Sequence, residues 1–98
     1  MFVLELTHTA PVEAVDAVLE AHVLWLDEQF AAGVFLASGP KSPRDGGVIL
    51  AVADSRAEVE KTTATDPFVV AEVCAYRITE FTATKTAPAL AQYRETPA

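Results

Sequence analysis

Residues 1–30 read MFVLELTHTAPVEAVDAVLEAHVLWLDEQF, and they set the first two elements of the chain. Apolar side chains at every second position of residues 1–7 predict a strand with one buried face. Pro11 suits the first turn of a helix, and apolar side chains then recur three and four positions apart. We therefore predict one long amphipathic helix over residues 12–30, ended by Gly33.

The remaining elements follow from shorter signals. Residues 34–38 and 48–53 are short apolar runs joined by a loop that contains glycine and proline, as in a hairpin. Ser55 and Glu58 have capping-box spacing, which predicts a second helix that ends near Thr65. Residues 73–81 return to the composition of a strand.

This order of elements predicts a ferredoxin-like α+β fold, βαββαβ, with a four-stranded antiparallel sheet and two helices on one face. A length of 98 residues with 51% hydrophobic side chains suits a single domain over residues 1–98. Within it, about 86–98 would form a C-terminal extension with a short helix near residues 89–93. Both hairpin strands are apolar on both faces, so we expect a second copy to cover the sheet face without helices, giving a homodimer.

Charge and cysteine content exclude several functions. The formal net charge is -7 and the seven basic residues are scattered singly, so we expect no nucleic-acid partner and no membrane partner. Cys74 is the single cysteine, which excludes an intrachain disulfide and a CxxC site.

No apolar run reaches the roughly 18 residues that span a bilayer, and the first residues lack the basic start of a secretory signal. The expected location is therefore cytoplasmic. No metal is expected, since no set of His, Cys and acidic residues has convincing ligand spacing. No cofactor is expected either.

His22 is the most informative candidate for chemistry. It falls in the middle of the apolar stripe of the first helix, so its imidazole is expected to face the core, where it could simply fill space. Asp66, before Pro67, could cap a turn, yet in the predicted fold it could also approach His22 within the helix-covered layer. A carboxylate there would orient the ring and fix its tautomer, as general acid–base catalysis requires.

Five further residues are candidates for substrate binding: His8, Ser38, Gly39, Pro40 and Phe68. His8 shares the parity of the buried side chains of the first strand, so it lies either at the mouth of a pocket or exposed at the strand end. Ser38, Gly39 and Pro40 follow the second strand, where backbone N–H groups could bind an oxygen as in an oxyanion site, or merely begin a loop.

Four side chains could contact a ligand or serve only the structure: Phe68, Lys41, Arg44 and Trp25. We place Phe68, close to Asp66 in sequence, among the substrate-binding residues. Lys41 and Arg44 could hold a carboxylate or a phenolate, although isolated loop cations are usually only solvated. Trp25 is expected in the core rather than in a cavity wall.

Five segments are distinctive in combination: EAHVLWLD (20–27), FLASGPKSPR (35–44), GGVIL (46–50), DPF (66–68) and EFTATK (80–85). Together they resemble the YciI-like, or YCII-related, family over nearly the whole chain to about Lys85. The resemblance implies a ferredoxin-like fold paired into a dimeric α+β barrel, with His22 and Asp66 as the proposed active-site dyad of the family.

Two functions remain open at this point. The first is a cofactor-free enzyme of lyase, isomerase or dehalogenase type, with His22 as base and Asp66 as its orienting group, acting on a small aromatic or carbonyl-bearing molecule. This class rests on analogy with related α+β barrel proteins. The second is a non-catalytic protein that binds a small molecule or assists an enzyme, in which the pair serves structure.

Overall fold

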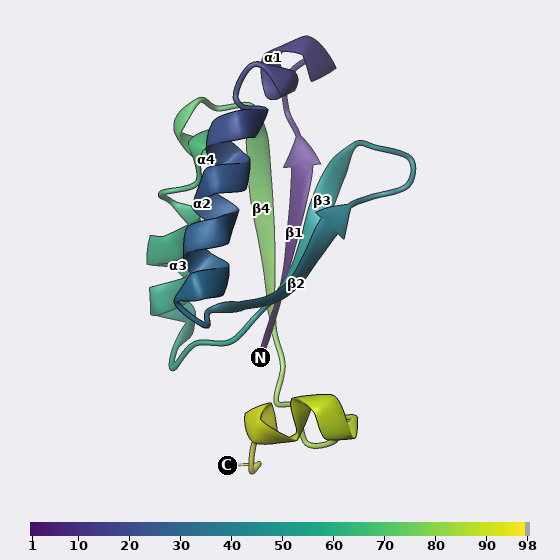
Figure 1. Ribbon diagram of the computed structural model, residues 1–98, viewed down its shortest axis with the longest axis vertical. Coiled ribbons are helices and arrows are strands. Elements are labelled where there is room, and N and C mark those ends of the chain that lie inside the picture. Colours follow the sequence, from purple (N-terminus) through teal and green to yellow (C-terminus); the bar gives the residue numbers. More distant parts are fainter. Residues whose placement is uncertain (98) are drawn as a thin grey trace.

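A computed structural model describes residues 1–97 and shows a twisted antiparallel sheet covered on one face by helices (Figure 1). The strand order across the sheet is β2-β3-β1-β4. The predicted ferredoxin-like βαββαβ fold is therefore confirmed. The elements are β1 (Phe2–His8), α1 (Val12–Asp16), α2 (Leu19–Ala31), β2 (Phe35–Pro40), β3 (Gly46–Ala51), α3 (Arg56–Thr63), α4 (Pro67–Val70), β4 (Cys74–Glu80) and the 3₁₀ helix η1 (Pro88–Tyr93).

The core lies between the sheet and the helices. Leu4, at the centre of β1, is opposite Ile49 of β3 and Ile78 of β4, and it is completely buried. Val15 of α1 and Val59 of α3 close the core from the helical side. Burial of apolar surface in this layer is the main favourable contribution to folding, at about 25 cal/mol per Å².

The first helix differs from the prediction. Instead of one helix over residues 12–30, the structure has α1 and α2 with a break between them. At the break Val18 has φ -111° and ψ -1°, and its N–H donates to the Val15 carbonyl three residues back at 3.0 Å. No proline or glycine lies between Val12 and Leu19, so neither of the usual helix-breaking residues marks the break in the sequence.

The hairpin is also longer than predicted. Strand β2 runs through Gly39 to Pro40 and does not stop at Ser38, and β3 begins at Gly46, so the loop spans residues 41–45. Proline is tolerated because β2 is an edge strand whose outer side needs no ladder hydrogen bond. At Gly46 a Cβ atom would lie 1.8 Å from a backbone oxygen of β1, so only glycine fits.

The second half of the chain brings Asp66 to the site. Ser55 caps α3 by accepting from the Glu58 N–H at 3.2 Å, as the capping-box spacing predicted. Asp66 then begins α4, a one-turn helix where only a turn was expected. The C-terminal segment, with η1 inside it, lies beyond the N-terminal end of β1 in Figure 1. Among residues 1–97 no helix is long and apolar enough to cross a membrane; the cytoplasmic location stays a prediction.

Candidate active site

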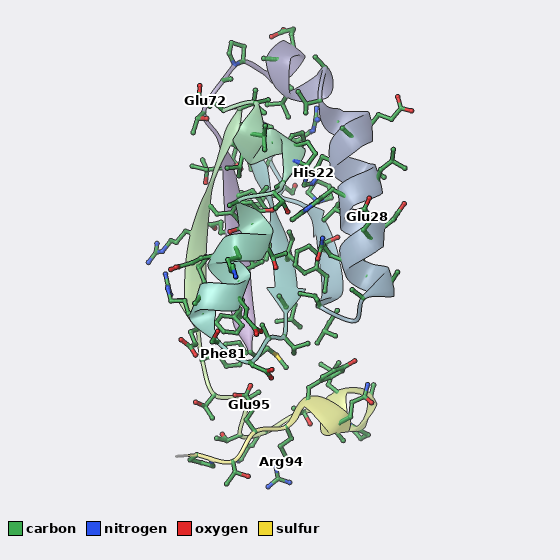
Figure 2. All side chains as sticks on the ribbon, turned by 90° about the vertical axis from the view of Figure 1, so that its left-hand side faces the viewer. His22, Glu28, Glu72, Phe81, Arg94 and Glu95 are labelled. Atoms are coloured by element: carbon green, nitrogen blue, oxygen red, sulfur yellow. The ribbon has the colours of Figure 1, made fainter. Side chains whose placement is uncertain are left out.

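His22 and Asp66 are in direct contact in the helical layer. His22 projects from α2 into the space between α2 and α4 (Figure 2). Its Nδ1 lies 2.8 Å from Asp66 Oδ1, and the two residues are 8% and 0% exposed. The imidazole stacks on Phe68, with 3.9 Å between ring centroids and 9° between planes. Two residues 44 positions apart in sequence therefore form one buried polar pair.

Asp66 fills two roles at the same time. Its Oδ1 accepts the Phe68 N–H at 2.9 Å, which is the N-cap interaction of α4, and the same oxygen contacts His22. The N-cap position therefore fixes the carboxylate where the imidazole needs a partner. The two interpretations that the sequence left open for this residue, a cap and a partner for His22, both apply.

Tyr76 of β4 is a third member of the cluster, and the sequence analysis missed it. Its hydroxyl donates to Asp66 Oδ2 at 2.5 Å. Burial, and secondly the negative charge of Asp66, raise the pKa of the Tyr76 phenol far above its ordinary value, so it remains a donor. A usable signal existed: Tyr76 alternates with Cys74 and Ile78 on the inward face of β4, and a buried tyrosine hydroxyl needs a partner.

These contacts determine the tautomer of His22. Asp66 accepts from the Phe68 N–H and the Tyr76 O–H, as a carboxylate does, so it also accepts from His22. Nδ1 therefore carries a hydrogen, and in the neutral form of the ring Nε2 carries the free electron pair. Nε2 is the nitrogen available to take a proton from a molecule beside the ring.

A cavity of about 520 Å³ lies against this cluster, between the helical layer and one end of the sheet. Most of its wall is apolar, with side chains such as Leu6, Leu19 and Ile49. Asp66 does not line it and lies behind His22. The assignment of the lining candidates to substrate binding stays a prediction. The lining includes the candidates His8, His22, Ser38, Gly39, Pro40 and Phe68.

Cys74 also lines the cavity and was not considered as a site residue. It is the cross-strand partner of His8, so the ends of β1 and β4 contribute these two side chains side by side. Burial, with a smaller effect of the Asp66 charge, raises the pKa of the Cys74 thiol, which keeps it protonated. Trp25 lies in the core, as expected, and its indole N–H donates to Thr65 Oγ1 at 2.9 Å.

The two loop cations differ in position. Arg44 lines the cavity, and its Nη2 lies 2.6 Å from Asp16 Oδ1 at the end of α1. Lys41 does not line it and forms ion pairs with Asp45 at 3.4 Å and Glu5 at 3.9 Å. Within residues 1–97, no group of three or more His, Cys, Asp and Glu side chains is arranged to hold a metal ion.

Comparisons with known proteins agree with this architecture. A search of curated proteins finds no significant match. Among solved structures, the chain is similar to 5-chloro-2-hydroxyhydroquinone dehydrochlorinase (TftG) from Burkholderia phenoliruptrix AC1100, determined in complex with 2,5-dihydroxybenzoquinone. The identity is 20%, the match covers 83% of this chain and 93% of that chain, and the TM-score is 0.67, which shows a shared fold. The family model of the YCII-related domain matches residues 1–82, and the chain therefore belongs to the YCII-related family, as the sequence resemblance predicted.

Proposed function

We propose that this protein is a cofactor-free enzyme that transfers a proton on a small molecule, in a reaction of lyase, isomerase or dehalogenase type. The observation that carries the proposal is the 2.8 Å contact between His22 Nδ1 and Asp66 Oδ1 at the wall of a 520 Å³ cavity. Nε2 of His22 acts as the base, while Asp66 orients the ring and stabilises the imidazolium that forms. The apolar wall suits an aromatic or quinonoid ring.

The comparison with TftG supports the reaction class. That protein is named for a dehydrochlorination and was determined with a quinone ligand, and this chain shares its fold. In loss of HCl from a chlorinated hydroxyhydroquinone, one hydroxyl hydrogen first moves to the chlorine-bearing carbon, which gives a keto tautomer. The base then takes a second hydroxyl proton, its O–H electron pair forms a second C=O, the ring double bond shifts to the chlorine-bearing carbon, and the carbon–chlorine pair leaves with chloride. A single imidazole next to a cavity can provide the proton-transfer part of this step.

The test is chloride release from 5-chloro-2-hydroxyhydroquinone. His22→Asn is expected to lower kcat by about 100-fold or more, the usual contribution of a positioned general base. The comparison variant is His8→Asn, which removes the other imidazole of the same cavity; as a candidate binding residue it is expected to raise KM while changing kcat by less than about tenfold. Turnover that persists in His22→Asn, with the fold intact, would rule out the dyad as the catalyst.

A non-catalytic role remains the competing function, because the close stacking of His22 on Phe68 would also serve core packing. In that case His22→Ala would leave the biological activity unchanged. It would reduce the free energy of unfolding by about 1–3 kcal/mol, because a buried hydrogen-bonding group loses its partner. A catalyst shows the opposite pattern, loss of turnover with a smaller loss of stability in His22→Asn.

We further propose that a second copy covers the sheet face without helices. Val3 and Leu50 are cross-strand partners. Because side chains alternate along a strand, these two lie on the other face of the sheet from the buried Leu4 and Ile49. Light scattering after size-exclusion chromatography is expected to show a dimer for the wild type and a monomer for Leu50→Glu. Leu24→Glu is the matched control, because Leu24 is 60% exposed on α2, and this variant should remain dimeric. A stable wild-type monomer at micromolar concentration would contradict the proposal.

A further inference from the structure

An ion pair bridges one edge of the cavity. Arg44 comes from the loop between β2 and β3, and Asp16 comes from the end of α1. Figure 1 shows this loop and α1 at the same end of the sheet. Arg44 Nη2 and Asp16 Oδ1 are 2.6 Å apart, their side chains are 44% and 50% exposed, and both residues line the cavity. The pair thus lies where the cavity meets solvent.

The charges along the cavity wall are few and unevenly placed. Among the described residues that line it, Arg44 is the only arginine or lysine and Asp16 the only carboxylate. The flanking positions on α2, Leu19 and Val23, are apolar. Asp66 is completely buried behind the wall. An anion bound in the cavity would therefore contact one permanent positive charge, on Arg44, and Asp16 at the edge is the one carboxylate among the described lining residues.

We propose that the cavity takes a single-ring organic anion, whose carboxylate or phenolate oxygen binds Arg44 in place of Asp16. The ring then lies against the apolar wall beside His22. This inference deepens the proposed function and rests on it, because it assigns a substrate class to the same cavity. Arg44 is a specificity-determining residue in this arrangement, and His22 remains the base.

The energetics favour this exchange of partners. An ion pair as exposed as that of Arg44 and Asp16 is screened by water and contributes little. A ligand oxygen next to the apolar wall is less screened, so the same guanidinium attracts it more strongly. The planar fork of arginine also matches a carboxylate with two parallel hydrogen bonds. A volume of about 520 Å³ accommodates one substituted ring.

Benzoate and benzamide provide a matched pair of probes, because they have nearly the same shape and differ in charge. Binding is measured by isothermal titration calorimetry at low salt. It is checked by the fluorescence of Trp25, the single tryptophan, whose ring centroid is 5.8 Å from that of His22. The wild type is expected to bind benzoate about tenfold more tightly than benzamide, the effect of one charge-assisted contact.

Two variants then separate charge from shape. Arg44→Gln is expected to weaken benzoate binding about tenfold and to leave benzamide binding within about twofold. Asp16→Asn removes the competing carboxylate and is expected to strengthen benzoate binding. Arg56→Gln is the matched control, since Arg56 is an exposed arginine paired with Glu60 at 3.1 Å on α3, and it should change neither affinity.

Three results would overturn the inference: no saturable benzoate binding by the wild type, unchanged benzoate affinity in Arg44→Gln, or equal losses for both probes in that variant. None of these readouts depends on turnover. Arg44-dependent benzoate binding together with undiminished turnover in His22→Asn would overturn the proposed function and leave the anion site standing. The reverse combination would overturn the anion site alone.

Discussion

The buried carboxylate of Asp66 makes a large and specific stability prediction. Three donors converge on it: Phe68 N at 2.9 Å, His22 Nδ1 at 2.8 Å and the Tyr76 hydroxyl at 2.5 Å. Asp66 is 0% exposed, so Asp66→Ala leaves three donors without their acceptor, two of them buried and the Tyr76 hydroxyl partly buried. At about 1–2 kcal/mol for each, the expected loss is about 3–6 kcal/mol. A domain of this size has about 5–15 kcal/mol in total, so this variant is expected to be marginally folded.

Asp66→Asn makes the prediction measurable in a protein that still folds. The amide keeps one acceptor oxygen and turns an NH₂ group toward a donor, so the expected loss is about 2–4 kcal/mol. Urea unfolding followed by the fluorescence of the single tryptophan, Trp25, gives the free energy of unfolding. Asp27→Asn is the matched control, because this exposed aspartate on α2 is expected to stay within about 0.5 kcal/mol of the wild type.

A double-mutant cycle with Tyr76→Phe tests whether the two residues act as one unit. Alone, Tyr76→Phe removes a donor from a buried carboxylate and is expected to cost about 1.5–3 kcal/mol. In the Asp66→Asn background the charge is absent, so the added cost is expected to be smaller by about 1 kcal/mol or more. Additive losses, or an Asp66→Asn variant as stable as the wild type, would show that the carboxylate does not hold the three donors together.

Four further changes have clear expected results. Gly46→Ala is expected to lose more than about 3 kcal/mol, because its Cβ would meet a backbone oxygen 1.8 Å away; Gly33→Ala, at φ +76° with open space around it, is expected to lose about 1 kcal/mol. The free energy of unfolding is expected to fall above about pH 10, because burial holds the pKa of Tyr76 above its value in the unfolded chain, so that only the unfolded state ionises in this range. Urea unfolding from pH 8 to 11 measures this loss, which is expected to be smaller in Tyr76→Phe. Thr65→Val is expected to cost about 1–2 kcal/mol, with a shifted emission of Trp25, because the indole N–H loses its acceptor.

The sequence was sufficient for the order of elements and for the inward direction of His22. Both follow from periodicity, since alternation marks strands and a spacing of three and four marks a helix face. The N-cap role of Asp66 was equally local, because an aspartate before proline suits the first turn of a helix. The break before Leu19 was not visible, because no proline or glycine marks it. The extension of β2 to Pro40 was not visible either, because it depends on the position of β2 at the sheet edge.

For the candidate site too, the sequence predicted some features and the tertiary structure decided others. Local pattern placed an imidazole on a buried helix face and a carboxylate at a turn, since each depends on a few adjacent residues. Only the tertiary structure joined them at 2.8 Å, added the Tyr76 hydroxyl from β4 and brought Arg44 beside Asp16. These contacts link elements far apart in the chain, and their distances depend on how the helices pack on the sheet. Periodicity along one element contains no information about that packing.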